Sequence, residues 1–328
     1  MIIVSVDSTR LGPAIGGCRI KTYPGWRDGL ADAVRLSAAM TEKAALAGLA
    51  YGGGKTVVAL DAPITGADRP RLLADVADLV ESFGGSYITG PDVGSSPEDM
   101  AVIRRTTEHA LCSPQSAGGG DSSVPTAAGV LASIEAVRAH RFPGRSLPSL
   151  SFAVLGLGHV GALVAADLAA AGARVTVTDI DPARRTPAYR WIEPAEALFA
   201  DVDAVVPAAV GGILRPDTVP GLRCGAIVGP ANNQLDDDAT AELLHARGIC
   251  WAPDTVVSAG GIISAVAREL EGAAPAEADR RVREIGVRLL EILSAAARRN
   301  TSPLREARRR VSRRRDYAGS VDSSTHRV

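Results

Sequence analysis

Hydrophobic and polar residues follow one another along the first third of the chain in patterns that predict short strands alternating with helices. Residues 2–7 (IIVSVD) alternate with the period of a half-buried strand and end at a turn-rich stretch. Residues 28–49 carry apolar side chains at helical spacing, among them Leu30, Val34 and Met40. The same patterns predict a strand over 18–23, a glycine-rich turn at 52–54 before a strand over 55–60, a helix over 68–85, a strand and then a loop over 86–94, and a helix over 96–105.

Two of these predicted helices carry recognisable signals at their ends. Pro70 suits the first turn of the helix over 68–85, and the pair Gly84–Gly85 suits its end. Ser96 precedes an acidic first turn, so we expect its side chain to cap the helix over 96–105.

The second part of the chain shows a regular succession of strands and helices. Residues 113–123 (SPQSAGGGDSS) are typical of a flexible loop and mark a candidate domain boundary, and a strong helical pattern follows over 124–140. From Ser151 onward strands and helices alternate, which indicates a parallel sheet. We therefore expect an α/β protein with one domain over 1–125, a second over 126–284, and C-terminal helices over 285–328 that return to the first.

Composition narrows the class of protein. The 328 residues are 46% hydrophobic and 22% charged with a net charge of −1, as in soluble globular proteins. This balance gives no overall attraction to nucleic acid or to an anionic membrane, and the arginine-rich C-terminal segment is expected to form a solvated helix with a frayed tail. The four cysteines are widely spaced, which favours reduced, buried thiols over disulfides or a metal site; they are Cys18, Cys112, Cys224 and Cys250.

The N-terminal segment lacks the pattern of a secretory signal. No basic region followed by a long apolar stretch occurs there, and no run of apolar residues in the chain is long enough to predict a membrane span. The sequence therefore predicts a cytoplasmic protein with no membrane partner.

The most diagnostic stretch for a cofactor is SFAVLGLGHVGALVAADLAAAGARVTVTD at 151–179. An apolar strand ends in a glycine-rich turn and a helix begins directly after it, so backbone N–H groups and the helix dipole can face a pyrophosphate. The alternative is a tight strand–helix turn that binds no ligand, but the acidic end of the next strand favours a dinucleotide. The residues expected to contact it are Gly156, Gly158, His159, Val160 and Gly161.

Asp179 ends the second strand of this motif and bears on the choice of cofactor. A carboxylate there accepts hydrogen bonds from ribose hydroxyls and repels a 2′-phosphate, which favours NAD over NADP. Arg184 and Arg185 follow closely and provide an alternative partner for a 2′-phosphate, although a solvated helix face explains them better.

Lys43, Lys55 and Asp92 are the candidate reactive side chains. Both lysines lie in apolar, glycine-rich sequence, where one can hold a substrate carboxylate while the other, desolvated, has a lowered pKa and acts as a base. The alternative is a pair of surface lysines. Asp92 follows a predicted strand at a Gly–Pro turn, where it either points into a site or caps the next helix.

As a set, six segments resemble the Glu/Leu/Phe/Val dehydrogenase family in order and spacing, from about residue 10 to about residue 295, with the leucine/phenylalanine branch most similar. The segments are LGPAIGGCRI, MTEKAALAGLAYGGGKTVV, YITGPDVGSSPEDM, VLGLGHVG, VGPANNQL and APDTVVSAGGI. The resemblance implies an N-terminal α/β substrate domain, a Rossmann-type doubly wound dinucleotide-binding domain, and an active site in the cleft between them. It also implies an NAD-dependent, reversible deamination of an L-amino acid to its 2-oxo acid and ammonia.

The resemblance assigns roles to particular residues. The lysine that matches Lys43 binds the substrate carboxylate, the lysine that matches Lys55 is the catalytic base, and the aspartate that matches Asp92 assists proton transfer. The other residues that it assigns are Gly16, Gly17 and Asn233 at the substrate and Asn232 and Ser258 at the cofactor.

Two departures from the family pattern carry expectations of their own. Ser258 replaces the asparagine of the family's NAGG motif, and its shorter reach is expected to weaken contacts to the nicotinamide. The family usually carries further residues before the strand that matches 2–7, so a smaller homo-oligomer such as a dimer is favoured over the family's larger assemblies.

The predicted pocket wall favours a bulky aliphatic or aromatic substrate. Gly90 and Ala265 stand where larger residues occur in similar enzymes, while Ile15, Met40 and Ile262 keep the wall apolar. Each buried methylene group contributes about 0.8 kcal/mol to a substrate that fills such space. The alternatives are a dehydrogenase of another small carboxylate, which needs no such lysine and aspartate set, and a non-catalytic NAD-binding relative.

Overall fold

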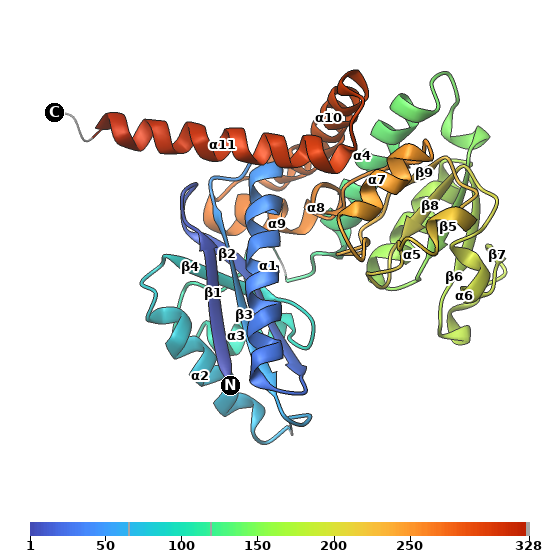
Figure 1. Cartoon of the computed structure of the whole chain (residues 1–328). Coiled ribbons are helices and arrows are strands. Elements are labelled where there is room, and N and C mark those ends of the chain that lie inside the picture. Colours follow the sequence, from blue (N-terminus) through green and yellow to red (C-terminus); the bar gives the residue numbers. More distant parts are fainter. Residues whose placement is uncertain (65, 119, 326–328) are drawn as a thin grey trace. The chain divides into compact units, whose positions relative to one another are not determined.

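The computed structural model describes residues 1–64, 66–118 and 120–325, without the side chains of 317–325 (Figure 1). The chain forms two compact units. The first unit comprises Met1–Ser122, Ala265–Pro275 and Arg310–Val328, and the second comprises Ser123–Ser264 and Ala276–Arg309. The assignment of substrate and cofactor roles to these units stays a prediction.

The first unit is built on a four-stranded sheet with the strand order β1-β3-β2-β4. Strands β2, β3 and β4 are parallel, and β1 at the edge pairs antiparallel with β3. The elements before Ser122 are β1 (Ile2–Ser8), β2 (Ala14–Thr22), α1 (Trp26–Leu46), β3 (Gly52–Leu60), α2 (Arg69–Glu81), β4 (Tyr87–Pro91) and α3 (Pro97–Ile103).

The helices of the first unit cover the two faces of this sheet differently. Helix α1 packs against β3 and β1, where Ala33 lies with Val57 and Ala59. Helices α2 and α3 pack on β4 and on the opposite face, where a larger cluster contains Cys18 and Val58. Because side chains alternate along a strand, the odd-numbered residues around Val57 of β3 point towards α1.

The predicted turn at 52–54 is wrong, because the three glycines are the first residues of β3. They are required by close packing rather than by a turn. A Cβ atom on Gly53 would lie 2.1 Å from the backbone nitrogen of Thr41 in α1, and one on Gly54 would lie 2.6 Å from the ring of Tyr87. The glycines therefore let a helix and a tyrosine lie directly against the strand.

The helix predicted over 28–49 is present, but its buried face differs from the expected one. Leu30 and Val34 are 38% and 54% exposed. The face against the sheet carries mostly small residues, because a Cβ atom on Gly29 would already lie 2.7 Å from the Cβ of Ala59. The buried residues of α1 are Gly29, Ala33, Leu36, Ser37, Thr41, Ala44, Ala45 and Leu46.

The second unit contains the parallel sheet that the sequence predicts. Its six strands are all parallel in the order β10-β9-β8-β5-β6-β7. This is the strand order of a doubly wound dinucleotide-binding fold, so the expected α/β class is confirmed. The strands are β5 (Ser151–Leu155), β6 (Arg174–Thr178), β7 (Arg190–Trp191), β8 (Ala204–Pro207), β9 (Ala226–Ile227) and β10 (Cys250–Trp251).

Helices and short turns connect these strands and complete the chain. The longer helices are α4 (Ser123–Arg141), α5 (His159–Ala170), α7 (Ala239–Ala246), α10 (Pro275–Arg299) and α11 (Pro303–Thr325). The shorter ones are α6 (Pro194–Ala197), α8 (Asp254–Val257), α9 (Gly260–Ala265), the 3-10 turns Leu147–Ser149, Pro182–Arg184 and Val219–Gly221, and a π-helical turn over Val266–Leu270. No helix within the described residues is long and apolar enough to cross a membrane.

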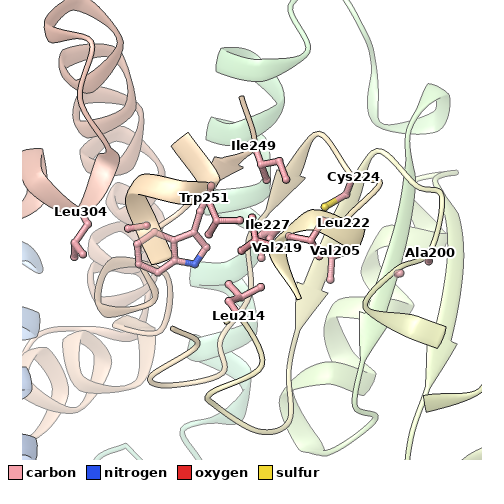
Figure 2. Packing of buried hydrophobic residues seen from close by; sticks show 13 residues of the cluster. Ala200, Val205, Leu214, Val219, Leu222, Cys224, Ile227, Ile249, Trp251 and Leu304 are labelled. Carbon is pink, nitrogen blue, oxygen red and sulfur yellow. The ribbon is translucent and has the colours of Figure 1, made fainter. Parts of the chain in front are cut away.

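A hydrophobic cluster of the second unit joins its sheet to the start of α11 (Figure 2). Ile227 and Trp251 come from adjacent strands, and Leu304 belongs to α11. Leu304, Ala307 and Val311 are all buried, so the expectation that the arginine-rich segment is a merely solvated helix is wrong. The predicted frayed tail lies partly outside the described residues.

Arginines of α11 also make specific contacts. Arg305 pairs with Glu242 in α7, and Arg308 pairs with Asp238 at the start of that helix, in the second unit. Arg314, in the first unit, donates to the carbonyl oxygens of Ala45 and Leu49 at the C-terminal end of α1, each at 2.9 Å. The arginines therefore cap and pair with neighbouring helices.

The predicted helix-end signals are confirmed. Ser96 accepts a hydrogen bond from the backbone of Asp99 while the Asp99 carboxylate accepts one from the backbone of Ser96, which forms a capping box at α3. Pro70 lies in the first turn of α2, and Gly84 and Gly85 follow its end with φ values of 55° and 83°.

Candidate active site

Lys55 and Asp92 meet directly in the first unit. The Lys55 Nζ atom lies 3.0 Å from Asp92 Oδ2, and the lysine side chain is only 5% exposed. Lys55 belongs to β3, whereas Asp92 directly follows β4 at Pro91. The fold therefore brings together two of the three reactive side chains predicted from the sequence.

Gly17 of β2 leaves the space in which this pair forms. A Cβ atom there would lie 2.8 Å from the Cβ of Asp92 and 3.3 Å from Lys55 Nζ. At Gly16 a Cβ atom would lie 1.7 Å from the carbonyl oxygen of Gly54, so this position is constrained by the neighbouring strand. Of the two predicted glycines, Gly17 is the one that contacts the reactive pair.

The backbone of Asp92 is fixed by the turn that follows it. Its N–H group donates to Ser95 Oγ at 3.0 Å, and the Ser95 hydroxyl donates to the carbonyl oxygen of Cys18 at 2.6 Å. The Ser95 N–H group donates back to the carbonyl oxygen of Asp92 at 3.0 Å. Asp92 is thus anchored to β2 as well as to β4.

Arg19 is a site residue that the sequence reasoning missed. Its Nε atom donates to Asp92 Oδ2 at 2.8 Å and its Nη1 atom donates to Asp32 Oδ2 at 2.9 Å. Asp32 belongs to α1, which covers this face of the sheet. The sequence contains a pattern that indicates Arg19. Because Arg19 is two residues beyond Gly17 on a strand, it shares the face of the strand on which Gly17 lies.

The charges of this cluster shift one another's protonation. Burial lowers the pKa of Lys55 because it penalises the ammonium form; Asp92 opposes this and Arg19 adds to it, and the net pKa lies below the usual lysine range. Burial by itself would raise the pKa of Asp92, but the charges of Lys55 and Arg19 outweigh it and lower the pKa. Asp92 is therefore ionised, and Lys55 loses its proton more readily than an exposed lysine.

The cysteines are all free thiols, and one lies beside the pair. Cys18 is buried on β2, and burial raises the pKa of its thiol to about 12. The thiol is therefore neutral at physiological pH and packs as a small apolar side chain.

The other residues predicted at the substrate lie on several elements. Lys43 and Met40 are half-buried on α1, Lys43 in its last turn. Gly90 lies near the end of β4, and a Cβ atom there would meet nothing nearer than Leu111 Cβ at 4.0 Å. Ile15 of β2 and Ala265 at the end of α9 are buried, and Ile262 is half-buried. Their contacts to a substrate stay predictions.

The glycine motif in the second unit has the geometry that a dinucleotide requires. Gly156 has φ 109°, which favours glycine, and a Cβ atom on Gly161 would lie 2.0 Å from the carbonyl oxygen of Gly156. A Cβ atom on Gly158 would meet nothing within 4 Å, so the backbone is open there. Helix α5 begins at His159 and continues through Val160, which directs its first N–H groups towards this opening.

Asp179 is held beside this motif by backbone hydrogen bonds. The N–H groups of Leu157 and Asp181 donate to its two carboxylate oxygens at 2.7 and 2.9 Å. Burial would raise the pKa of Asp179, but these hydrogen bonds and the charge of Arg184 lower it. Arg184 also donates to the carbonyl oxygen of Leu157, and its Nε atom lies 3.9 Å from Asp179 Oδ2.

A pocket of about 380 Å³ lies next to Asp179. It is mainly apolar, with Ile180 and Phe199 among its lining residues, and Thr178 contributes a hydroxyl group. Among the described residues, Thr178 Oγ1 is a buried side-chain atom without a hydrogen-bond partner. A mainly apolar pocket beside the Asp179 carboxylate suits a flat heteroaromatic ring that carries a ribose, so these residues fit the adenosine part of a dinucleotide.

The segment around Asn232 and Asn233 is firmly built into the second unit. Asn233 has φ 53°, and its N–H group donates to Asp254 Oδ2 at 2.5 Å. Ser258 Oγ donates to the carbonyl oxygen of Asp254 at 2.6 Å and lies 3.4 Å from Asn232 Oδ1. Two residues predicted at the cofactor, Asn232 and Ser258, are therefore neighbours.

Gln234 holds this segment to the core and was not singled out in the sequence. Its side-chain nitrogen donates to the carbonyl oxygen of Gly229 at 2.7 Å, and its oxygen accepts from Trp251 Nε1 at 3.0 Å. The glutamine is completely buried, so it is a structural support for the adjacent asparagines.

Comparisons with known proteins agree along nearly the whole chain. The model of the Glu/Leu/Phe/Val dehydrogenase dimerisation domain matches residues 3–109, and the model of the glutamate/leucine/phenylalanine/valine dehydrogenase domain matches residues 177–315. The chain is 37% identical to a phenylalanine dehydrogenase of Caldalkalibacillus thermarum, over 98% of this chain and 89% of the relative. It is 35% identical to a leucine dehydrogenase of Thermoactinomyces intermedius, over 90% of this chain and 82% of the relative.

A solved structure is similar in fold as well as in sequence. The L-tryptophan dehydrogenase of Nostoc punctiforme superposes with a TM-score of 0.83 at 32% identity, covering 97% of this chain and 92% of that one. The two family models together match more than half of the chain, and they include Lys55, Asp92 and Asn233. On this evidence the chain belongs to the Glu/Leu/Phe/Val dehydrogenase family.

Proposed function

We propose that this protein catalyses the reversible, NAD-dependent oxidative deamination of a hydrophobic L-amino acid to its 2-oxo acid and ammonia. The observation that carries the proposal is the direct pairing of a buried lysine, Lys55, with Asp92 at a position kept open by Gly17. Family membership supports it, since the relatives are named as dehydrogenases of phenylalanine, leucine, valine and tryptophan. The reaction is an oxidation of a CH–NH2 group.

Each polar group has a distinct task in this proposal. The nicotinamide, when bound, accepts a hydride from the substrate Cα. Lys43 holds the substrate carboxylate and thereby orients the Cα hydrogen. This lowers the entropic cost of bringing the reacting groups into position. Lys55 takes a proton from the water that attacks the resulting iminium carbon, and Asp92 moves protons to and from the amino nitrogen as ammonia leaves.

The pKa shifts agree with these tasks. Lys55 acts as a base only when it is neutral, and its lowered pKa increases the neutral fraction at a given pH. The rate of deamination should therefore rise with pH as Lys55 loses its proton, at a pH below the usual lysine range. Asp92 remains ionised through this range because its pKa is lowered.

The cofactor is a nicotinamide dinucleotide, and we propose NAD rather than NADP. The Asp179 carboxylate lies beside the glycine motif and the mainly apolar pocket. There it would accept hydrogen bonds from ribose hydroxyls and repel a 2′-phosphate. Asn232 and Ser258 would contact the nicotinamide end.

The preferred substrate in this proposal has a bulky apolar side chain. The space beside Gly90 holds no atom closer than Leu111 Cβ, so the wall lacks a methyl group at this position. Because each methylene that fills such space contributes about 0.8 kcal/mol, larger apolar side chains gain affinity.

We further propose that a second copy of the chain covers an exposed apolar stripe on α1. Trp26, Leu30 and Val34 are spaced four residues apart and are 43%, 38% and 54% exposed. Residues at this spacing share one face of a helix. The stripe lies within the segment that matches the dimerisation-domain model, which favours a homo-oligomer such as a dimer.

A panel of L-amino acids with NAD, followed at the absorbance of the reduced nicotinamide, tests the proposed function. We expect turnover with bulky apolar amino acids and, in reverse, a strict requirement for ammonia. Lys55→Ala should lower kcat at least about 100-fold, because a general base typically contributes that much, while NAD binding measured by calorimetry is retained.

The control is Lys21→Ala, which removes an exposed lysine of the same unit and should leave kcat within twofold of the wild type, on the order expected of a surface change. Unchanged turnover in Lys55→Ala would contradict the assigned role. Binding of NAD without turnover of any amino acid would instead support a non-catalytic relative.

A further inference from the structure

Arg19 connects the reactive pair to helix α1. Its guanidinium group reaches Asp92 Oδ2 through Nε and Asp32 Oδ2 through Nη1, at 2.8 and 2.9 Å, and its side chain is only 15% exposed. Neither Arg19 nor Asp32 has a task in the reaction proposed above.

We infer that Arg19 is the positioning residue of the reactive pair: it occupies Oδ2 of Asp92 together with Lys55, so that Oδ1 is left to exchange protons with the substrate nitrogen. This inference rests on the proposed deamination. In the forward direction Oδ1 accepts a proton from the substrate ammonium group and returns it to the amino nitrogen before ammonia departs, so Asp92 ends the cycle ionised. The hydroxyl proton of the carbinolamine leaves with ammonia as ammonium, and Lys55 releases to solvent the proton that it took from water.

The two oxygens of Asp92 are used unequally. Oδ2 accepts from Arg19 Nε and lies 3.0 Å from Lys55 Nζ, so it receives both cations. Within the described part of the chain no hydrogen bond reaches Oδ1. A carboxylate held at one oxygen cannot rotate freely, and this fixes the direction of the other oxygen.

Asp32 prevents Arg19 from leaving its position. It accepts hydrogen bonds from the Tyr23 hydroxyl at 2.7 Å and from Arg35 at 2.6 Å in addition to Arg19. Burial would raise the pKa of Asp32, but these donors lower it to about 2, so the anchor is ionised. Tyr23 remains a neutral donor, since burial and Asp32 raise its pKa to about 12.

Arg19 also supplies a permanent positive charge beside Lys55. Within the described residues, the other titratable groups close enough to act on Lys55 are Asp92 after β4 and the neutral Cys18 thiol on the opposite face of β2, while α1 contributes Asp32 through Arg19. The positive charge of Arg19 disfavours the ammonium form of Lys55. Arg19 also binds the same Asp92 oxygen, which would otherwise stabilise that ammonium form more strongly. Loss of Arg19 raises the pKa of Lys55 for both reasons.

The experiment compares Arg19→Gln with Arg19→Lys. In Arg19→Gln the acidic limb of the kcat/KM profile should move to higher pH by about one unit, and kcat near neutral pH should fall about tenfold, with KM for the amino acid little changed. In Arg19→Lys the charge is kept but the planar fork is lost, so kcat should fall while the acidic limb stays within about 0.3 unit of the wild type.

A second readout does not depend on turnover. The chain has three lysines, Lys21, Lys43 and Lys55, so the rate of acetylation of Lys55 by acetic anhydride can be followed against pH by peptide mass spectrometry, with exposed Lys21 as the internal reference. The midpoint for Lys55 should rise in Arg19→Gln and not in Arg19→Lys. If the wild type turns over no amino acid, the proposed function fails, whereas this titration still tests the effect of Arg19 on Lys55.

The matched control is Arg145→Gln, which removes another partly buried arginine–aspartate pair, with Asp203 in the second unit. It should reduce stability without moving the pH profile or the Lys55 titration. A merely structural Arg19 would behave in the same way. An unmoved Lys55 midpoint in folded Arg19→Gln overturns the inference, and so does a wild-type kcat in Arg19→Lys, the variant that best preserves folding.

Discussion

Gly17 lies where any larger residue would push Lys55 and Asp92 apart. The reactive pair forms on the face of β2 that lacks a side chain at this position, and a Cβ atom there would lie 2.8 Å from the Asp92 Cβ and 3.0 Å from the Pro91 carbonyl oxygen. The backbone carbonyl cannot move without disturbing the pairing of β2 with β4. At the scale of single residues, this site therefore requires the absence of a methyl group at position 17 as well as its charged groups.

We therefore predict that Gly17→Ala lowers kcat about 100-fold in a folded protein, because a displacement of about 1 Å at reacting groups costs this much. Steady-state kinetics at saturating NAD and circular dichroism provide the two measurements. Gly66→Ala is the control, because a Cβ atom on Gly66 meets nothing within 4 Å. Wild-type kinetics in Gly17→Ala would show that the pair tolerates displacement.

Helix α3 begins a few residues after Asp92, and its N-terminal end is fixed by a cap and by an ion pair. The Ser96 and Asp99 side chains and backbones satisfy each other at its start, and Arg69 of α2 donates to both oxygens of Asp99 at 2.9 and 2.6 Å. The pKa of Asp99 is lowered by these donors against the effect of burial. Its contribution to stability is therefore present above the unfolded-state pKa of Asp and is lost as the pH falls through the lower folded-state value.

We predict that Ser96→Ala lowers the free energy of unfolding by about 1 kcal/mol, the usual cost of losing an N-cap. Urea unfolding at neutral pH measures this difference. Ser82→Ala is the matched control, since the exposed Ser82 hydroxyl donates only to the Leu79 carbonyl oxygen at the end of α2, and a change within about 0.5 kcal/mol is expected. Equal effects in the two variants would argue against the cap.

At the scale of the whole molecule, the two faces of α1 differ in the size of their side chains and in their burial. Its small residues lie against the sheet, and its large apolar residues Leu30 and Val34 face outwards. In the proposed oligomer a second chain would bury Leu30 and Val34, which would account for apolar positions of α1 that its buried face does not include. This arrangement links the fold of the first unit to the proposed oligomer.

We predict that Val34→Glu shifts the protein to a smaller assembly, because a charge placed in an apolar interface must be desolvated on association. Light scattering after size-exclusion chromatography, over a range of concentrations, measures the mass. Val287→Glu is the control, since Val287 is 61% exposed on α10 in the second unit. If Val34→Glu retains the wild-type mass, the stripe on α1 is not the contact.

Several features could be predicted from the sequence because they depend on local spacing. The strand, glycine turn and helix around Gly156 and Gly161 need only adjacent residues, as does the cap at Ser96, and the structure has all of them. The periodic segments located most helices, and the ordered motifs indicated the family. Lys55 and Asp92 were singled out by their unusual neighbours in the chain.

The tertiary structure alone decided which groups meet. Lys55, Arg19 and Asp92 come from β3, β2 and the end of β4, so their contact depends on strand order and register, which no local pattern encodes. Gly52–Gly54 resemble a turn in the sequence, but they belong to a strand. Glycine is needed there because Thr41 and Tyr87 approach the strand too closely to leave room for side chains at Gly53 and Gly54. Close approach is a property of two surfaces, and the sequence of one segment does not specify the other.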